Sequence, residues 1–421
     1  MKHTVIIGGG AIGLFAAYFL RKSGHEVTLA DKGNVPGLHS CSSGNAGLIV
    51  PSHFMPIANR AAVREGLANL FKPAAPFGIK WSFNPELFGW LWSFYLSSRN
   101  RNMGDKVQFL ADFHLKSREL YRAIQEDEGL NLTLSLSGLH MVSEKAETFR
   151  NDVKAAGDAA NLGIPAEIWT AEKYRDQNPA LDPRIAGAVF YPWDGNIDPL
   201  PMLNHIKHWL LDNGVTIMEN TPVREWIKGQ SGFEGIRLAD KLVKADNYLV
   251  CAGDQSSEVL QGTGLSVPLQ PAKGFSYLVR NAGESLSHPA LLQDRHVAIT
   301  PYKTHTRIAG NFLLGMNRIE DPGPRISRIG SSVSEVFPGW DLPSPKPEQV
   351  WSGNRPVSPD GLPLIGISSV FPNLAIATGH AMMGISLAPV TGSLVADWLS
   401  GRDTNRGWRN ILLPSRFGNR F

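Results

Sequence analysis

The chain has 421 residues, of which 43% are hydrophobic and 19% are charged, and its formal net charge is +3. A chain of this length and composition is globular, and it can bury a large core and form two or three domains. The small net charge argues against nucleic acid as a partner. The two cysteines, Cys41 and Cys251, are far apart in the chain, so they predict neither a disulfide framework nor a metal site.

The chain opens with a predicted strand, a glycine-rich turn and a helix. Residues 5–7 form a short apolar run typical of a buried parallel strand, and Gly8, Gly10 and Gly13 follow in the spacing G-x-G-x-x-G. Gly8 permits a tight turn, Gly10 lets a pyrophosphate approach the backbone, and Gly13 lets the helix pack closely on the strand. The N-terminal end of that helix then offers free N–H groups to the pyrophosphate.

A second predicted strand, residues 27–30, ends at Asp31, where a carboxylate can accept hydrogen bonds from both hydroxyls of an adenosine ribose. The unit therefore predicts a dinucleotide site. We interpret the N-terminus as mature structure and not as a signal peptide, because its glycines have this role and no small-residue cleavage site stands out. No apolar run in the sequence is long enough to span a membrane, and we expect a cytoplasmic protein, or one at the cytoplasmic face of the membrane.

Small residues crowd the loop that follows, which ends Ser42-Ser43-Gly44-Asn45-Ala46-Gly47. Such a composition suits backbone held close to a ligand. The opening unit and this loop together resemble the D-amino-acid oxidase superfamily of FAD enzymes, and most closely its D-amino-acid dehydrogenase branch. The resemblance implies that the loop runs beside the ribityl chain and the flavin ring. Some relatives hold the flavin covalently on a histidine of this loop, but the nearest matching position here is Asn45, so we expect non-covalent FAD.

Aromatic residues crowd the stretch from 77 to 96. We interpret the stretch as a buried helix pair, and the alternative is an amphipathic patch that contacts a membrane or a partner subunit. Lys80, Arg99 and Arg101 flank it and keep that alternative open. A long amphipathic helix is predicted over residues 107–128. The aromatic residues are Phe77, Trp81, Phe83, Phe88, Trp90, Trp92, Phe94 and Tyr95.

The middle of the chain predicts an inserted unit and then a return to the cofactor domain. A helix begins after Asp198 and is followed by a strand over 215–218; the resemblance implies that these return the chain to the FAD domain, with the backbone near Val223 at the adenine. A further apolar strand precedes Ala252 and Gly253, which allow close approach to the pyrophosphate. Cys251 is interpreted as a small core residue.

Strands and turns alternate between residues 268 and 351, which predicts an antiparallel sheet carrying the substrate face. The expected strands are residues 276–279, 298–301 and 306–309. Polar and apolar residues alternate here, so Tyr277, Tyr302 and Arg307 are site candidates, although each could equally point from the opposite face. His53, in the earlier loop, is a further candidate for the flavin pocket.

The segment Trp351-Ser-Gly-Asn-Arg-Pro-Val-Ser-Pro-Asp-Gly-Leu-Pro-Leu-Ile-Gly366 closely resembles the most specific C-terminal segment of the same family. The resemblance implies that Arg355 binds the substrate carboxylate, and a planar guanidinium suits a carboxylate because it can donate two parallel hydrogen bonds. A helix over 385–399 follows, with its N-terminus expected at the flavin. The last residues, 402–421, are interpreted as a basic, solvated tail.

These patterns predict an α/β fold: a discontinuous Rossmann-like FAD-binding domain (residues 1–75, 198–265 and 350–401) with an inserted α+β substrate domain on an antiparallel sheet (76–197 and 266–349). The expected catalytic residues are Arg355, Tyr302, Arg307, Tyr277 and His53, and no metal ligand is expected. The expected FAD-binding residues are Gly8, Gly10, Ala11, Ile12, Gly13, Asp31, Lys32, Ser43, Gly44, Asn45, Ala46, Gly47, Val223, Ala252, Gly253, Gly379, Met382, Met383 and Gly384.

The expected reaction is oxidative deamination of an amino or imino acid, most of all a D-amino acid such as D-proline or hydroxyproline, with hydride transfer from Cα to flavin N5. Electrons would pass to a quinone or respiratory acceptor. Two alternatives remain open: a sarcosine- or glycine-type amine oxidase that uses oxygen, and a flavin-binding subunit that transfers electrons without a substrate of its own.

Overall fold

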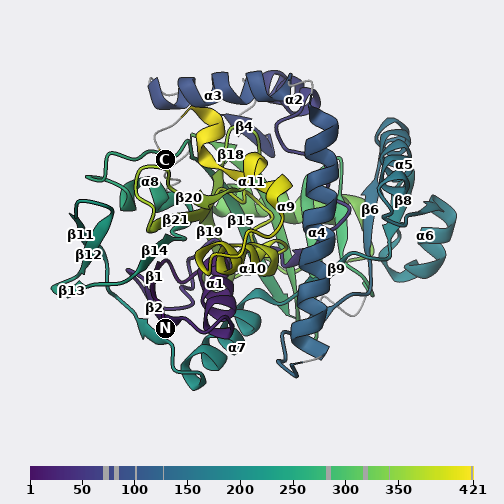
Figure 1. Cartoon of the computed structure of the whole chain (residues 1–421). Helices are drawn as coiled ribbons and strands as arrows, with labels where there is room; N and C mark the ends of the chain where they lie inside the picture. Colours follow the sequence, from purple (N-terminus) through teal and green to yellow (C-terminus); the bar gives the residue numbers. More distant parts are fainter. Residues whose placement is uncertain are drawn as a thin grey trace.

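The computed structural model describes residues 1–69, 75–79, 85–99, 102–126, 128–280, 286–315, 321–340, 342–418 and 421. Within these residues the chain builds two large sheets, which lie side by side with helices on their outer faces (Figure 1). Residues from both ends of the chain enter the first sheet, and this brings the glycine-rich turn close to the C-terminal segments.

The first sheet has the strand order β10-β2-β1-β14-β21-β20. Its pairs are parallel except for β20, which runs antiparallel to β21. Both faces of its central strands are covered, and this explains the continuous apolar runs of β1 and β14. The bounds are β1 His3–Ile7, β2 Glu26–Ala30, β10 Thr216–Met218, β14 Asn247–Val250, β20 Leu364–Ile367 and β21 Leu374–Thr378.

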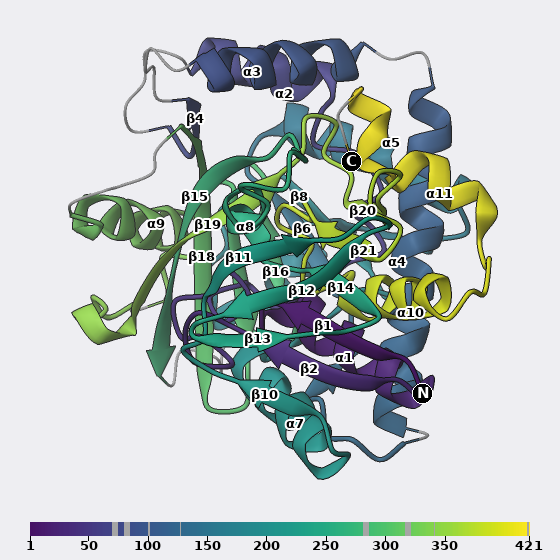
Figure 2. The same ribbon diagram turned by 60° about the vertical axis from the view of Figure 1, so that its left-hand side comes forward.

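Helices cover one face of this sheet and a small antiparallel sheet covers the other. On the helical side, α1 (Ala11–Lys22), α7 (Pro199–Asp212) and α10 (Ala388–Leu399) share one hydrophobic core with the sheet. On the opposite side, the core includes Trp226 and Phe233 of the small sheet, which stands in front of β1 and β14 in Figure 2. The bounds of that sheet are β11 Val223–Lys228, β12 Phe233–Leu238 and β13 Lys241–Val243.

The second sheet has the order β19-β15-β18-β17-β16-β6-β8-β7, and β4 also pairs with β18. The antiparallel pairing of β15, β17 and β18 confirms the three strands predicted there. The bounds are β4 Phe77–Ile79, β6 Leu139–Ser143, β7 Glu167–Thr170, β8 Gly187–Tyr191, β15 Gln270–Arg280, β16 Ala290–Leu292, β17 Val297–Pro301, β18 His305–Leu314 and β19 Val350–Val357. A third, short sheet has the order β3-β9-β5, with the bounds β3 Leu48–Ile49, β9 Gly195–Ile197 and β5 Leu134–Ser135.

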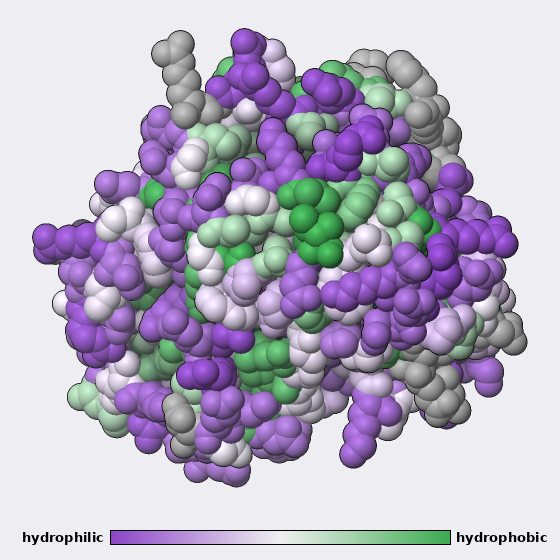
Figure 3. Space-filling model, turned by 90° about the vertical axis from the view of Figure 1, so that its right-hand side faces the viewer, coloured by the Kyte–Doolittle hydropathy of each residue, from purple (hydrophilic) through white to green (hydrophobic). Residues whose placement is uncertain are grey.

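The helix α9 (Gly323–Val336) packs under one face of the second sheet, and α4 (Met103–Glu126) packs against α10 of the first. The face that carries α5 and α6 is mainly hydrophilic, with small separate apolar areas (Figure 3). The remaining helices are α2 Arg60–Ala68, α3 Pro85–Ser98, α5 Ala146–Asn161, α6 Ala171–Gln177, α8 Ser256–Val259 and α11 Arg406–Leu412, with short 3-10 turns at Pro179–Leu181, Gly253–Gln255, Pro347–Gln349 and Pro414–Phe417.

The aromatic stretch from 77 to 96 is not the predicted buried helix pair. Its described part consists of strand β4 and the single helix α3, along the top of Figure 1. α3 buries Leu87, Trp90 and Phe94, whereas Phe88, Trp92 and Leu96 on its other side are 43%, 62% and 52% exposed. Sequence reasoning erred because apolar residues at both helix faces give no sign of which face is covered. Trp81, Phe83, Lys80 and Arg101 lie outside the described residues.

Three further expectations need correction. The segment between 268 and 351 contains α9, which the interpretation as strands and turns missed. The helix predicted from residue 385 begins at Ala388, after a turn that proves important for the site. The C-terminal tail is not simply solvated: Leu412 and Phe421 are buried, and Arg416 forms a buried ion pair with Asp360.

The division into domains stays a prediction. Strand β19, which that division places in the FAD domain, pairs with β15 in the second sheet from Gln270↔Val357 to Tyr277↔Val350. Among the described residues, no helix has both the length and the apolar character that crossing a membrane requires.

Candidate functional site

The glycine-rich turn between β1 and α1 has the close contacts that its spacing predicts. Gly8 adopts φ +113°, and a Cβ on it would lie 2.4 Å from the carbonyl oxygen of Cys251 on the neighbouring strand. A Cβ on Gly13 would lie 1.8 Å from the carbonyl oxygen of Gly8, so this position is restricted by helix–strand packing. A Cβ on Gly10 would meet only the Ser42 hydroxyl, at 3.2 Å, and Gly10 faces the cavity described next.

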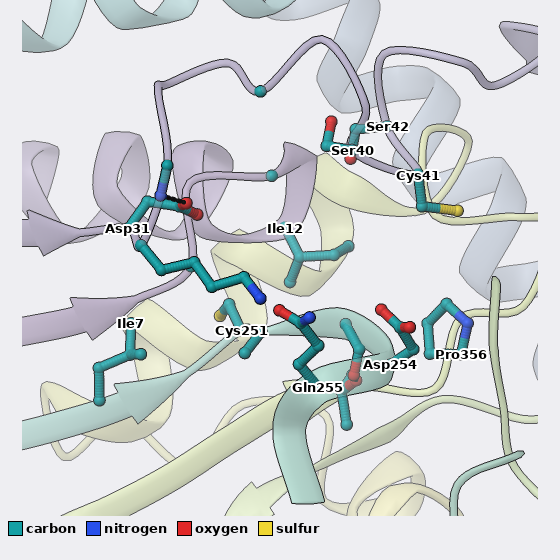
Figure 4. Close-up of a pocket in the computed structure, with 18 of the residues that line it drawn as sticks. Ile7, Ile12, Asp31, Ser40, Cys41, Ser42, Cys251, Asp254, Gln255 and Pro356 are labelled. Atoms are coloured by element: carbon teal, nitrogen blue, oxygen red, sulfur yellow. Dashed lines mark hydrogen bonds between the residues drawn. The ribbon is translucent and has the colours of Figure 1, made fainter. Parts of the chain in front are cut away.

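A cavity of about 930 Å³ runs along this turn. It extends from the end of β2 across the glycine-rich turn and the start of η2 (Gly253–Gln255) to the turn before α10. In Figure 4, Asp31 and Pro356 stand at opposite sides of it, with Gln255 and Asp254 between them. A ligand here would be long, with its ends near β2 and near the turn that precedes α10.

Asp31 is positioned at one end of the cavity by two backbone hydrogen bonds. The N–H of Gly9 donates to Oδ2 and the N–H of Gly33 donates to Oδ1, both at 2.8 Å. Each carboxylate oxygen keeps a further lone pair, so Asp31 can accept hydrogen bonds from vicinal hydroxyls such as those of a ribose. Lys32 and Val223 line the cavity as well.

In the small-residue loop, the structure brings Ser42 to the glycine-rich turn in place of Ser43. Ser42 Oγ accepts a hydrogen bond from the N–H of Ala11 at 2.9 Å, whereas the Ser43 hydroxyl donates to the carbonyl of Gly37, and Ser43 does not line the cavity. Gly44 is required by packing, because its Cβ would fall 1.9 Å from the indole of Trp351. Asn45 lines the cavity, and its amide donates to the carbonyl of Met382 at 3.0 Å.

The predicted cofactor residues therefore divide into two groups. Those that line the cavity are Gly8, Gly10, Ala11, Ile12, Asp31, Lys32, Asn45, Val223, Ala252, Gly253 and Gly384. The residues that do not line the cavity are Gly13, Ser43, Gly44, Ala46, Gly47, Gly379, Met382 and Met383. Sequence reasoning missed Ser42, Cys41, Asp254, Gln255, His380 and Ile385, although each lies within three residues of a predicted one.

Arg355 lies on the face of the second sheet that also carries Trp351 and Ser276. Alternate residues of β19 share a face, and Trp351 pairs directly with Ser276. The guanidinium covers Gly274, where a Cβ would fall 1.9 Å from Nη1. Nη1 donates to the carbonyl oxygen of Asn311 at 2.8 Å. Among the described residues this is the hydrogen bond that the guanidinium makes. Desolvation lowers the pKa of Arg355, so an anion bound beside the guanidinium would stabilise its charged form.

Arg307 also lies on this face, because it pairs with Leu278, two residues along β15 from Ser276. It is 5% exposed, and its Nη1 approaches Ser276 Oγ at 3.4 Å. Within the described chain, neither Arg307 Nε nor Trp351 Nε1 has a hydrogen-bond partner, and both atoms are buried. Because buried N–H groups are normally paired, these unpaired donors indicate that this face of the sheet can bind a ligand that carries hydrogen-bond acceptors.

Ser276 and Tyr302 attach the small-residue loop to this sheet. Ser276 Oγ donates to the carbonyl of Gly44 and Tyr302 Oη donates to the carbonyl of Ala46, both at 2.9 Å. Tyr302 therefore lies near the site, but its hydroxyl is engaged with the loop. Gly47, with φ +73°, completes the loop, because a Cβ there would lie 2.1 Å from the carbonyl of Ile197.

Tyr277 is a correction: it projects from the opposite face of β15. It is 1% exposed and packs in the core under α9 with Phe275 and Val333, where no substrate can reach it. The alternation of β15 made either face equally acceptable in sequence, and the packing of α9 decided it.

His53 belongs to a buried polar cluster with Ser52 and Asp194. Ser52 Oγ donates to Asp194 Oδ2 at 2.5 Å and lies 3.2 Å from His53 Nδ1. Burial raises the pKa of Asp194 to about 7 and lowers the pKa of His53 to about 4. A histidine that stays neutral at pH 7 is not the positive charge that a carboxylate needs, and His53 is not among the residues that line the cavity.

The donor set fits FAD. Asp31 offers acceptors where a ribose would lie, the glycine-rich turn has no side chain in the path of a pyrophosphate, and the cavity continues beyond it for an aromatic ring system. The arrangement thus supplies a dinucleotide cradle with a donor-rich sheet face next to its far end.

Solved structures with the same fold support this reading of the architecture. Glycine oxidase from Geobacillus kaustophilus is 21% identical, with 96% of each chain covered and a TM-score of 0.75. L-proline dehydrogenase from P. horikoshii is 18% identical, with 99% of this chain and 98% of that chain covered and a TM-score of 0.76. L-amino acid deaminase from Proteus vulgaris is 17% identical, with 96% and 90% covered and a TM-score of 0.70.

The family model described as "DAO: FAD dependent oxidoreductase" matches residues 3–398, which is nearly the whole chain. The glycine-rich turn, the Asp31 carboxylate and the cavity between them are what such a family requires for its cofactor. This chain belongs to the DAO family of FAD-dependent oxidoreductases.

Proposed function

We propose that this enzyme oxidises the Cα–N bond of an amino or imino acid, most of all one of the D series, and that Arg355 binds the substrate carboxylate. The observation that carries the proposal is the half-buried Arg355, whose guanidinium lies on Gly274 and, among the described residues, makes one hydrogen bond, to the carbonyl of Asn311. A half-buried arginine with unused donors favours a planar anion that can accept two hydrogen bonds.

The neighbouring donors support the same interpretation. Trp351 Nε1 and Arg307 Nε are buried, have no acceptor among the described residues and lie on the face that carries Arg355. Arg355 would fix the carboxylate and thereby orient the substrate Cα. Bound FAD supplies the two-electron acceptor for the hydrogen that leaves Cα as a hydride. No side-chain base is required if the amine binds in its neutral form, and fixing this geometry accounts for much of the rate.

The D configuration is proposed from the resemblance of the 42–47 loop and the 351–366 segment to D-amino-acid dehydrogenases. Fold neighbours named for glycine, L-proline and L-amino acids have the same architecture, so the fold leaves the substrate open. We therefore include cyclic and N-methylated amino acids among the substrates to be tested.

The test replaces Arg355 by Met and by Lys in protein that retains FAD. Turnover should fall at least about 100-fold in Arg355→Met, because loss of a buried charge-assisted hydrogen-bond pair costs roughly 3 kcal/mol of transition-state binding. Arg355→Lys keeps the positive charge but not the two parallel donors of a guanidinium, so its turnover should lie between those of wild type and Arg355→Met. Arg237→Met, at a 43% exposed arginine paired with Glu225 on the outer sheet, should equal wild type. Undiminished turnover in Arg355→Met would remove the carboxylate role.

A substrate panel then separates the alternatives. Anaerobic titration with D- and L-amino acids, proline, hydroxyproline, sarcosine and glycine should bleach the flavin with one D-substrate class. Bleaching only by glycine or N-methyl amines would support the amine-oxidase alternative. A flavin that no amine reduces would support the electron-transfer subunit, although such a subunit would not need an arginine that binds a carboxylate.

We propose a quinone or another respiratory carrier as the electron acceptor. The exposed aromatic side of α3, with Phe88 and Trp92, supports a contact at a membrane surface, because aromatic side chains are favoured at the bilayer interface. Turnover with a soluble quinone analogue should exceed turnover with oxygen at equal substrate. Equal rates would favour an oxidase.

A further inference from the structure

Three polar side chains project from one side of α4 into the interior of the protein. His114, Ser117 and Tyr121 stand at helical positions i, i+3 and i+7, which share one face. All three are buried, with exposures of 1%, 0% and 0%. Burying a polar side chain costs free energy unless it is hydrogen-bonded, so the polarity of these three residues needs a reason.

Each of the three contacts the short turn formed by residues 383–386, which lies just before α10. Tyr121 Oη donates to the carbonyl of Ile385 and Ser117 Oγ donates to the carbonyl of Ser386, both at 2.6 Å. His114 Nδ1 lies 3.0 Å from the Ser386 hydroxyl, and His114 Nε2 lies 3.2 Å from the sulfur of Met383. Nearly 270 residues separate these partners in the chain, so the contacts are tertiary in origin.

The 383–386 turn is also part of the cofactor cavity, because Gly384 and Ile385 line it. Across the part of the chain that the structure describes, the backbone N–H groups of these two residues donate to no protein acceptor. The carbonyl of Ile385 accepts a hydrogen bond from Tyr121 and one from the N–H of Ala388. Tyr121 and Ser117 therefore hold two carbonyls of a turn that lines the cofactor cavity, and His114 holds two of its side chains.

We propose that His114, Ser117 and Tyr121 are positioning residues that set the affinity of the enzyme for FAD and its preference for the reduced form. Preorganised N–H dipoles favour the form of a ligand that carries more negative charge, and reduced flavin carries more than oxidised flavin. Fixed carbonyls keep those N–H groups in place before the cofactor binds. The inference rests on the FAD cavity alone and stands whether or not the proposed substrate is correct.

The test removes single hydroxyls and reads the flavin, not turnover. Tyr121→Phe and Ser117→Ala should each weaken FAD binding about tenfold, measured by titrating flavin-free protein with FAD. They should also shift the two-electron midpoint potential of the bound flavin to more negative values. A tenfold loss of preference for the reduced form corresponds to about 30 mV. Ser117→Thr, which keeps the hydroxyl, should restore wild-type values.

Tyr174→Phe is the matched control. Tyr174 is another fully buried tyrosine, in the core under α9, and its hydroxyl has no partner in the described chain. The FAD affinity and the flavin midpoint potential of Tyr174→Phe should equal those of wild type. The proposal is overturned if Tyr121→Phe and Ser117→Ala bind FAD within twofold of wild type at an unchanged potential, even where their thermal stability falls. Equal losses in Tyr174→Phe would overturn it as well.

Discussion

The C-terminal tail should stabilise the folded protein largely through one buried ion pair. Arg416 Nε and Nη2 donate to the two carboxylate oxygens of Asp360, each at 2.9 Å, with side-chain exposures of 13% and 3%. Lys106 Nζ lies 3.4 Å from the same carboxylate. Arg416 also donates to the carbonyl of Leu362, so it ties the tail to the loop that follows Arg355.

Arg416→Met should lower the free energy of unfolding by about 3 kcal/mol at pH 7, because the change leaves the Asp360 carboxylate buried with a partial partner in Lys106. Burial raises the pKa of Asp360, but Arg416 and Lys106 outweigh burial and hold the pKa below its usual value. A carboxyl whose folded pKa is lowered stabilises the protein above its unfolded pKa. The difference between wild type and variant should therefore shrink as the pH falls below about 4.

The assay is urea unfolding in excess FAD, with the free energy taken by linear extrapolation. Arg406→Met is the control, since Arg406 is 82% exposed and pairs with Asp403 in the same tail, and its cost should stay below about 0.5 kcal/mol. Arg416→Met combined with Asp360→Leu should recover part of the loss, because the buried carboxylate is removed while Lys106 loses its partner. A cost below about 1 kcal/mol for Arg416→Met would refute the reasoning.

Two further outcomes follow from the site. Gly13→Ala should abolish stable FAD binding, because its Cβ would lie 1.8 Å from the backbone oxygen of Gly8; Gly157→Ala, at a helical glycine with no heavy atom within 4 Å of its Cβ, should bind FAD normally, and retained binding in Gly13→Ala would contradict this account. Asp194→Asn should remove a pH dependence of the free energy of unfolding. Burial raises the pKa of Asp194 to about 7. The stabilisation that the protonated carboxyl contributes is therefore present below the unfolded pKa and is lost as the pH rises through 7. The stability of Asp194→Asn relative to wild type should therefore increase between pH 4 and 8, by up to roughly 4 kcal/mol, and parallel pH curves would show that Asp194 is ionised in the fold.

Much of the cofactor half could be predicted because its requirements are local. A positive φ at Gly8, the missing Cβ at Gly10 and the carboxylate of Asp31 each constrain a few consecutive residues. The lack of a side chain is visible in sequence, and so is the apolar strand that precedes it. The family resemblance at residues 351–366 added the expectation that Arg355 binds the substrate carboxylate, which no periodicity could indicate.

The sequence-based predictions were wrong where two different structures are compatible with the same sequence pattern. Ser42 and Ser43 are adjacent and chemically identical, and the loop conformation alone decides which hydroxyl reaches Ala11. Tyr277 and Ser276 alternate on a strand buried on both faces, so the hydrophobic pattern does not distinguish the faces. The aromatic residues of α3 likewise gave no sign of which side would be covered.

By itself, the sequence determined the cofactor class and the glycine-rich turn, because backbone geometry and side-chain absence act over a few residues. Only the tertiary structure decided which side chains act together. The contacts of Tyr121 with Ile385, of Arg355 with Gly274 and of Arg416 with Asp360 join segments far apart in the chain. Such pairs form when separate elements pack, since hydrogen bonds and ion pairs depend on distances in space that sequence spacing does not carry.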